Sequence, residues 1–343
     1  MSDTTMSLRR KISSAGDLQS VVRTMKALAA SSIGQYEQSV RALADYYRTV
    51  EIGLSMCFRE IGPAAQLAEG NARTGGASVG AVVFGSDQGL VGQFNDLVAD
   101  FAVNTLAALP GKHQIWAVGE RVHARLKDAG LPMVGLFAVP NSVNAITPLV
   151  GQILVESEAR RSHSEVVELH LFYNRSSSGA VYEPVNQRLL PLDETWRRKL
   201  AKLPWPTGNL PEVMGDGTAT LRALIREYLF VSLFRACAES LASENASRLA
   251  AMQRADNNID ELLKHLNGTF HRLRQLGDER FAKLEIVGGG FELKRVKAGR
   301  GTSRERAIGP AHRADPDLSA AILIEEYRAQ ALVFRGKRQQ AEF

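Results

Sequence analysis

The stretch best placed to do chemistry is Gly85–Gly92, GSDQGLVG, which follows a β-branched run and precedes a helical pattern. A glycine-rich turn at that place can bind phosphate, because backbone N–H groups and the helix dipole favour an anion at a helix N-terminus. A P-loop needs G-x-x-x-x-G-K-[ST], and a dinucleotide fingerprint needs G-x-G-x-x-G. Neither pattern is present, so the stretch predicts a tight structural turn.

The other reactive residue types form no recognisable constellation. The seven histidines make no H-x-x-x-H pair, and none stands beside a cysteine at a metal-ligand spacing. No G-x-S-x-G nucleophile motif occurs. The two cysteines, Cys57 and Cys237, fall on apolar helix faces and are interpreted as core residues of a reducing compartment. We therefore predict no catalytic residue, no cofactor and no metal site in this chain.

The turn belongs to a predicted α/β domain over residues 79–191. Apolar, strand-like runs alternate with helical patterns, the runs at 79–85, 114–118, 133–139 and 166–173 and the helices at 95–109, 120–129 and 146–160. A fifth strand within 180–191 is expected to pair with the fourth. This alternation predicts a Rossmann-like α/β fold with a mostly parallel sheet. Asn95 is expected to cap the first helix, and residues 192–216, rich in Pro, Gly and Trp, are interpreted as a connection.

Two long helices flank this domain. From Leu8 to Ile61 the apolar residues recur at spacings of three and four, the 3.5-residue period of a coiled coil. A similar stripe runs from about Thr218 to Val287 and ends at three glycines. At 1.5 Å per residue the helices would be roughly 80 and 100 Å long. The simplest arrangement is a long antiparallel coiled coil of 1–61 with 218–287; a helical bundle packed onto the domain is the alternative.

The net charge of +5 is concentrated at the end of the chain. Residues 294–343 hold 11 Lys or Arg and 6 Asp or Glu, which leaves 31 of each sign in residues 1–293. The basic balance therefore indicates a basic C-terminal extension, expected to be partly disordered, and no nucleic-acid partner for the body. The sequence contains no run of 18 uncharged apolar residues, so no membrane span is predicted. The N-terminus lacks the apolar core of a secretory signal.

Small residues dominate the outward faces of two helical segments, Ala27–Ser32 and Ala242–Met252. An alanine-rich helix is one explanation, since Ala favours helix formation. Two slim segments on two long helices also suit a shaft that fits inside another structure.

These segments carry a resemblance to a known family, the γ subunit of F-type ATP synthases (F1 central stalk). RRKI at 9–12 and VVRTMKALAASS at 21–32 resemble its N-terminal signature, and GSDQGLVGQFN at 85–95 resembles its central-domain motif. LFRACAESLASENASRLAAMQRADNN at 233–258 resembles its C-terminal signature, and EIVGG at 285–289 its usual end. The resemblance covers about residues 1–293.

The resemblance implies a non-catalytic rotor subunit of an ion-translocating ATPase. Its paired helices would form the central shaft inside a ring of three α and three β subunits, with the α/β domain meeting the ε subunit and the membrane c ring. Ion-driven rotation of the c ring would cycle the β subunits for ATP synthesis or, in reverse, hydrolysis. The chain would be peripheral on the cytoplasmic face of the bacterial inner membrane.

By motif match, the resemblance also implies partner-contact residues, namely Arg10, Arg23, Met25, Lys26, Glu244 and Arg248. Met25 and Lys26 would face the moving lever of the β subunit, and the C-terminal pair would face the same region. Met25→Lys is therefore expected to impair coupling more than stability, because it places a second cation beside Lys26.

The sequence departs from the family in two places. Residues 276–284 read LGDERFAKL where the family usually has I-T-x-E-L, and residues 294–343 extend past the usual end. The extension is either a tolerated addition or a regulatory or anchoring contact. Two other readings remain open: a γ-like subunit of an alternative Na⁺-translocating ATPase, since ion choice is made in the c ring, and a stand-alone α/β enzyme.

Overall fold

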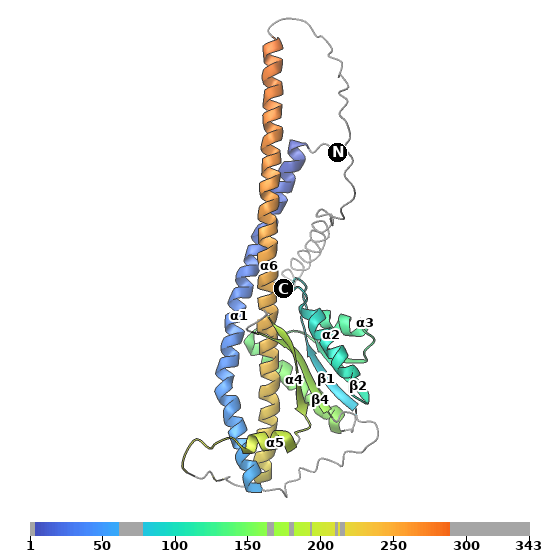
Figure 1. Ribbon diagram of the computed structural model, residues 1–343, viewed down its shortest axis with the longest axis vertical. Coiled ribbons are helices and arrows are strands. Elements are labelled where there is room, and N and C mark those ends of the chain that lie inside the picture. Colours follow the sequence, from blue (N-terminus) through green and yellow to red (C-terminus); the bar gives the residue numbers. More distant parts are fainter. Residues whose placement is uncertain are drawn as a thin grey trace, which may run out of the picture. The chain divides into compact units, whose positions relative to one another are not determined.

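The computed structural model describes residues 4–61, 78–162, 168–177, 182–192, 194–209, 212 and 217–288. The stretch 62–77 after the first predicted helix and the basic extension at 294–343 lie outside the described residues. Within them, the chain forms a long helix, then an α/β domain, then a second long helix (Figure 1).

The two long helices are α1, Thr5–Ile61, and α6, Gly217–Gly288, close to the bounds that the apolar spacing predicts. They run antiparallel, because Gln19 of α1 contacts Asp256 of α6 whereas Tyr46 contacts Glu227. Figure 1 shows them side by side. The predicted antiparallel pairing is therefore confirmed.

The side of α1 that faces α6 follows a seven-residue repeat. Its buried members are Leu8, Ala15, Val22, Ala29, Tyr36, Val50 and Cys57, with Leu43 half-buried in register. A seven-residue repeat keeps one narrow seam against one partner and is the period of a left-handed coiled coil. The narrow seam over residues 8–36 is typical of a two-helix coiled coil and not of a helical bundle.

The α/β domain contains one five-stranded sheet with the strand order β3-β2-β1-β4-β5. The strands are β1 Ser78–Phe84, β2 Lys112–Val118, β3 Met133–Phe137, β4 Glu168–Arg175 and β5 Glu183–Leu190. The first four are parallel, and β5 pairs antiparallel with β4. The predicted alternation and the predicted fifth strand are both confirmed.

Alternation along β1 sends its side chains into two separate cores. Val79, Ala81 and Val83 pack against α2, Phe94–Ala107, and α3, Glu120–Asp128. Val82 and Phe84 point to the opposite face, where the core is completed by α4, Ile146–Ser162, together with α1 and α6. A short 3₁₀ turn, Val143–Ala145, leads into α4. The sheet therefore packs on the long helices through one of its two faces.

The stretch interpreted as a connection contains a helix, which corrects that prediction. Helix α5, Glu194–Ala201, brings Trp196 between the two long helices: its Nε1 donates to the Tyr228 hydroxyl at 3.0 Å, and its ring meets that of Phe58 edge-on at 5.9 Å. Sequence reasoning missed this short helical pattern because the surrounding stretch, 192–216, is rich in turn-forming residues. The Trp196 side chain, partly buried against Tyr228 and Phe58, anchors this short helix to both long helices.

The predicted cap of α2 is also wrong. The helix begins at Phe94 with Gln93 before it, so Asn95 lies inside the first turn. Its side chain contacts Ser86 instead of the helix N-terminus.

Candidate functional site

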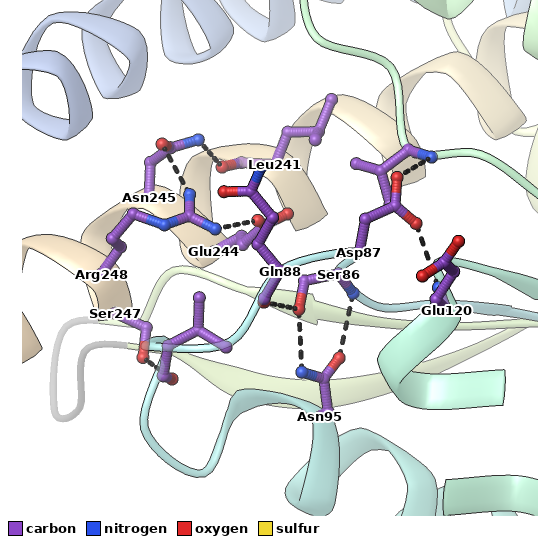
Figure 2. Close-up of polar contacts among 12 residues, drawn as sticks. Ser86, Asp87, Gln88, Asn95, Glu120, Leu241, Glu244, Asn245, Ser247 and Arg248 are labelled. Atoms are coloured by element: carbon purple, nitrogen blue, oxygen red, sulfur yellow. Dashed lines mark hydrogen bonds and ion pairs between the residues drawn. The ribbon is translucent and has the colours of Figure 1, made fainter. Parts of the chain in front are cut away.

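The Gly85–Gly92 turn is a tight structural turn, as predicted, and it is held by its own domain. The Gly85 N–H donates to the Val118 carbonyl at 2.8 Å, which continues the strand pairing. Asn95 then binds Ser86 twice: its Oδ1 accepts from the Ser86 N–H at 2.9 Å, and its Nδ2 donates to the Ser86 Oγ at 2.8 Å. Ser86 is fully buried, so Asn95 takes the place of water around it (Figure 2).

Asp87 ties the turn to two further elements. Its carboxylate accepts from the Glu120 N–H at 3.0 Å, at the start of α3, and from the Val139 N–H at 2.9 Å, just after β3. A carboxylate at a helix N-terminus is favoured by the helix dipole. Both carboxylate oxygens of Asp87 are thus occupied by backbone donors, which assigns it a structural role in this turn.

Helix α6 lies against the other side of the turn. The Ser247 hydroxyl donates to the Val91 carbonyl, and both residues are buried (Figure 2). Beside them, the Arg248 guanidinium donates to Glu244 Oε1 at 2.5 Å and to Asn245 Oδ1 at 3.2 Å. Burial raises the pKa of Glu244 above its usual range, and Arg248 only partly opposes that rise.

A second polar cluster joins α1 to α6 nearer the N-terminus of α1. Asp256 accepts from Gln19 Nε2 at 3.3 Å, from Arg23 Nε at 3.2 Å and from Lys26 Nζ at 3.3 Å. Gln19 also donates to Asp260. Burial acts to raise the pKa of Asp256, but the donors from Lys26, Arg23 and Gln19 outweigh it and hold that pKa below its usual range.

The six predicted contact residues fall into two groups in the structure. On α1, Arg10 is exposed, the Arg23 side chain is 58% exposed, Lys26 is 34% exposed and Met25 is half-buried. On α6, the side chains of Glu244 and Arg248 are only 7% and 14% exposed and are paired with each other. The α1 residues therefore lie where a partner can reach them, whereas Glu244 is enclosed by its own chain.

Sequence reasoning missed Asp256, Gln19 and Ser247. A signal for Asp256 was present, because it is a lone acid at the end of an alanine-rich segment and α1 offers Arg23 and Lys26. Using that signal required the register of the two antiparallel helices, which the heptad pattern alone does not give.

Among the described residues, no three His, Cys, Asp or Glu side chains are grouped to hold a metal ion. In the same part of the chain, no helix combines the length and the apolar character that crossing a membrane requires.

Fold and site together define a protein in which an α/β domain is inserted between the two helices of a long coiled coil, with its buried polar residues used to join elements. A family model described as ATP synthase matches residues 4–277. The chain belongs to the ATP synthase gamma-subunit family, as its motifs indicate.

Its relatives include bacterial ATP synthase gamma chains that the similarity covers almost completely. The ATP synthase gamma chain of Polynucleobacter asymbioticus is 25% identical over 301 residues, covering 83% of this chain and 98% of that one. The gamma chain of Nocardioides sp. is 28% identical over 304 residues, covering 85% of this chain and 97% of that one.

Solved structures share the fold. A chain of the Euglena gracilis mitochondrial ATP synthase OSCP/F1/c-ring, rotational state 3, has a TM-score of 0.54 at 16% identity, covering 86% of this chain and 99% of that one. A chain of the rotor of the same enzyme in rotational state 1 has a TM-score of 0.52 at 17% identity, covering 79% of this chain and 97% of that one. Both likenesses confirm long terminal helices around an α/β domain.

Proposed function

We propose that this chain is the central rotor shaft of an F-type ATP synthase. The observation that carries the proposal is α6, one helix from Gly217 to Gly288 that pairs with α1 along one side and with the sheet of the α/β domain along another. A turning force on the domain would reach the tip of the coiled coil through this one helix. Family membership supplies the machine in which such a shaft works.

In this role the chain couples ion-driven rotation of a membrane c ring to conformational cycling of the β subunits in an α₃β₃ ring. The coiled coil has one helix of each kind and no symmetry, so it presents a different face to each of the three β subunits. Contacts that differ between the faces favour different conformations of the β subunits. A bound partner shifts a conformational equilibrium in this way, without taking part in the chemical reaction. The domain end would meet the ε subunit and the c ring, which keeps the chain at the cytoplasmic face of a bacterial inner membrane.

The α1 surface around Met25 is the contact region that we propose for the β subunits, with Arg10 and Arg23 as further contacts. Lys26 and Arg23 already share Asp256, so a lysine at position 25 would add a further positive charge beside them. Met25→Lys is expected to lower the number of ions pumped per ATP hydrolysed while leaving the melting temperature of the chain within about 2 °C, because the lysine stem can cover the half-buried site while its ammonium group reaches water. Equal pumping ratios in variant and parent vesicles would contradict this contact.

The function is tested by replacing the chain in the cell that produces it. Deletion of residues 1–293 is expected to abolish ATP-driven ion pumping by membrane vesicles, and a plasmid copy of the full chain is expected to restore it. A tagged copy should co-purify α, β, ε and c subunits. Pumping assayed separately with H⁺ and Na⁺ decides the coupling ion, and a purified chain that never associates with α or β would refute the proposal.

A further inference from the structure

The Gly85–Gly92 turn is fixed on the domain side and is positioned to act as a joint with the shaft. Asn95 and Asp87 anchor it to α2, α3 and the end of β3. Within it, Leu90 has φ of 64° and Gly92 has φ of 58°, which are left-handed conformations. Such a conformation at a leucine persists only where the surroundings fix it. The turn is therefore rigid.

The turn contacts α6 through the carbonyl of Val91. This carbonyl accepts from the Ser247 hydroxyl and also from the Phe94 N–H, at 3.3 Å, in the first turn of α2. The same carbonyl oxygen is therefore hydrogen-bonded both by the domain and by the shaft helix α6. A Cβ at Gly92 would lie 3.6 Å from Ser247 Oγ and 3.8 Å from the guanidinium of Arg254, so α6 passes directly over the turn.

The kind of contact between the α/β domain and α6 determines how well their interface resists a turning force. The burial of apolar surface favours contact between the domain and α6, but the hydrophobic effect is not itself directional. A hydrogen bond has a preferred distance and angle. Ser247 and the neighbouring Glu244–Arg248 pair belong to a segment of α6, Glu239–Arg248, whose buried side chains are mostly polar.

We infer that Ser247 and the Gly85–Gly92 turn form the joint that fixes the α/β domain to the shaft, so that torque received by the domain turns α6 without slip. The inference rests on the proposed rotor function. Ser247 acts as a positioning residue, through the carbonyl of Val91.

The first test measures the joint in the purified full chain. Ser247→Ala is expected to speed hydrogen exchange of the Phe94 and Leu97 amides by about fivefold, the factor that one net hydrogen bond represents. Ser247→Thr, which keeps the hydroxyl, should restore the parent rate. Ser243→Ala is the matched control, since Ser243 is equally buried on α6 and its hydroxyl has no partner among the described residues. Exchange unchanged in Ser247→Ala overturns the joint.

The second test measures torque in the complete complex. Against an opposing ion gradient, Ser247→Ala is expected to pump fewer ions per ATP than the parent, because a joint without this hydrogen bond would slip under load. Ser247→Thr and Ser243→Ala should match the parent. A parent-like ratio in Ser247→Ala overturns the torque role even when exchange is faster.

A cross-link supplies the opposite perturbation. A Cβ at position 92 would lie 3.6 Å from Ser247 Oγ, which brings the two side chains close enough to try a disulfide in a Gly92→Cys, Ser247→Cys double variant. The oxidised complex is expected to rotate and pump as its reduced form does, with the two single variants as controls. Activity lost on oxidation and regained on reduction would show that turn and shaft must separate, which contradicts the inference. A parent complex that does not rotate refutes the rotor proposal alone, and amide exchange still decides the joint.

Discussion

Asn95→Ala is expected to destabilise the chain by about 1–3 kcal/mol, more than an exposed polar substitution. The change removes the acceptor of the Ser86 N–H at 2.9 Å and the donor to Ser86 Oγ at 2.8 Å, and Ser86 is fully buried. An unsatisfied buried donor costs about 1–3 kcal/mol, and a second lost hydrogen bond about 1 kcal/mol. The better helix propensity of Ala returns at most roughly 0.7 kcal/mol.

The assay is urea unfolding of the full chain, followed by circular dichroism and by tryptophan fluorescence. Asn104→Ala is the matched control, because it is the same change on an exposed face of the same helix; it is expected to stay within about 0.5 kcal/mol of the parent. Asn95→Asp keeps one of the two contacts and should fall between them. An Asn95→Ala chain as stable as the Asn104→Ala chain would refute the assignment of Asn95 as the anchor of the turn.

Three further predictions concern the core, the turn and the coiled coil. Leu54→Ala removes a fully buried side chain from the core that α1 shares with the sheet, and should cost about 2–5 kcal/mol in urea unfolding. Gly119→Ala should lower the melting temperature more than Gly130→Ala, because both glycines have positive φ but only at Gly119 would a Cβ lie 2.8 Å from the Ser86 backbone. Asp256 has a lowered pKa when folded, so its stabilisation is present above the unfolded pKa, about 3.9, and is lost as pH falls through the folded pKa; Asp256→Asn should therefore flatten the loss of stability below about pH 4.

The elements that rest on local periodicity were predictable. The heptad from Leu8 to Cys57 gives α1 within three residues of its start, and the apolar run at β1 gives a strand of the sheet. The antiparallel direction followed from the compact domain between the helices. These features depend on spacing along the chain, which a sequence displays directly.

The features that rest on distant contacts were not predictable in the same way. Asn95 has the residue type of a helix cap, but Ser86 competes for its side chain and wins because it is buried. Helix α5 depends on Trp196 reaching Tyr228 and Phe58 on two other helices. Glu244 lies in a motif expected to contact a partner, and only the packing of α6 on the domain shows that it is enclosed. Each of these features involves a tertiary contact that the local sequence does not display.

The central claim, that this chain is a rotating shaft, is tested most directly by watching it turn. The α₃β₃ ring would be fixed to a surface together with this chain, and a bead attached through an added cysteine on the exposed surface of the α/β domain would report its motion. We predict continuous rotation in one direction on addition of ATP, stopping when ATP is removed. ATP hydrolysis by the assembled ring while the bead stays still, in complexes shown to contain this chain, would contradict the account.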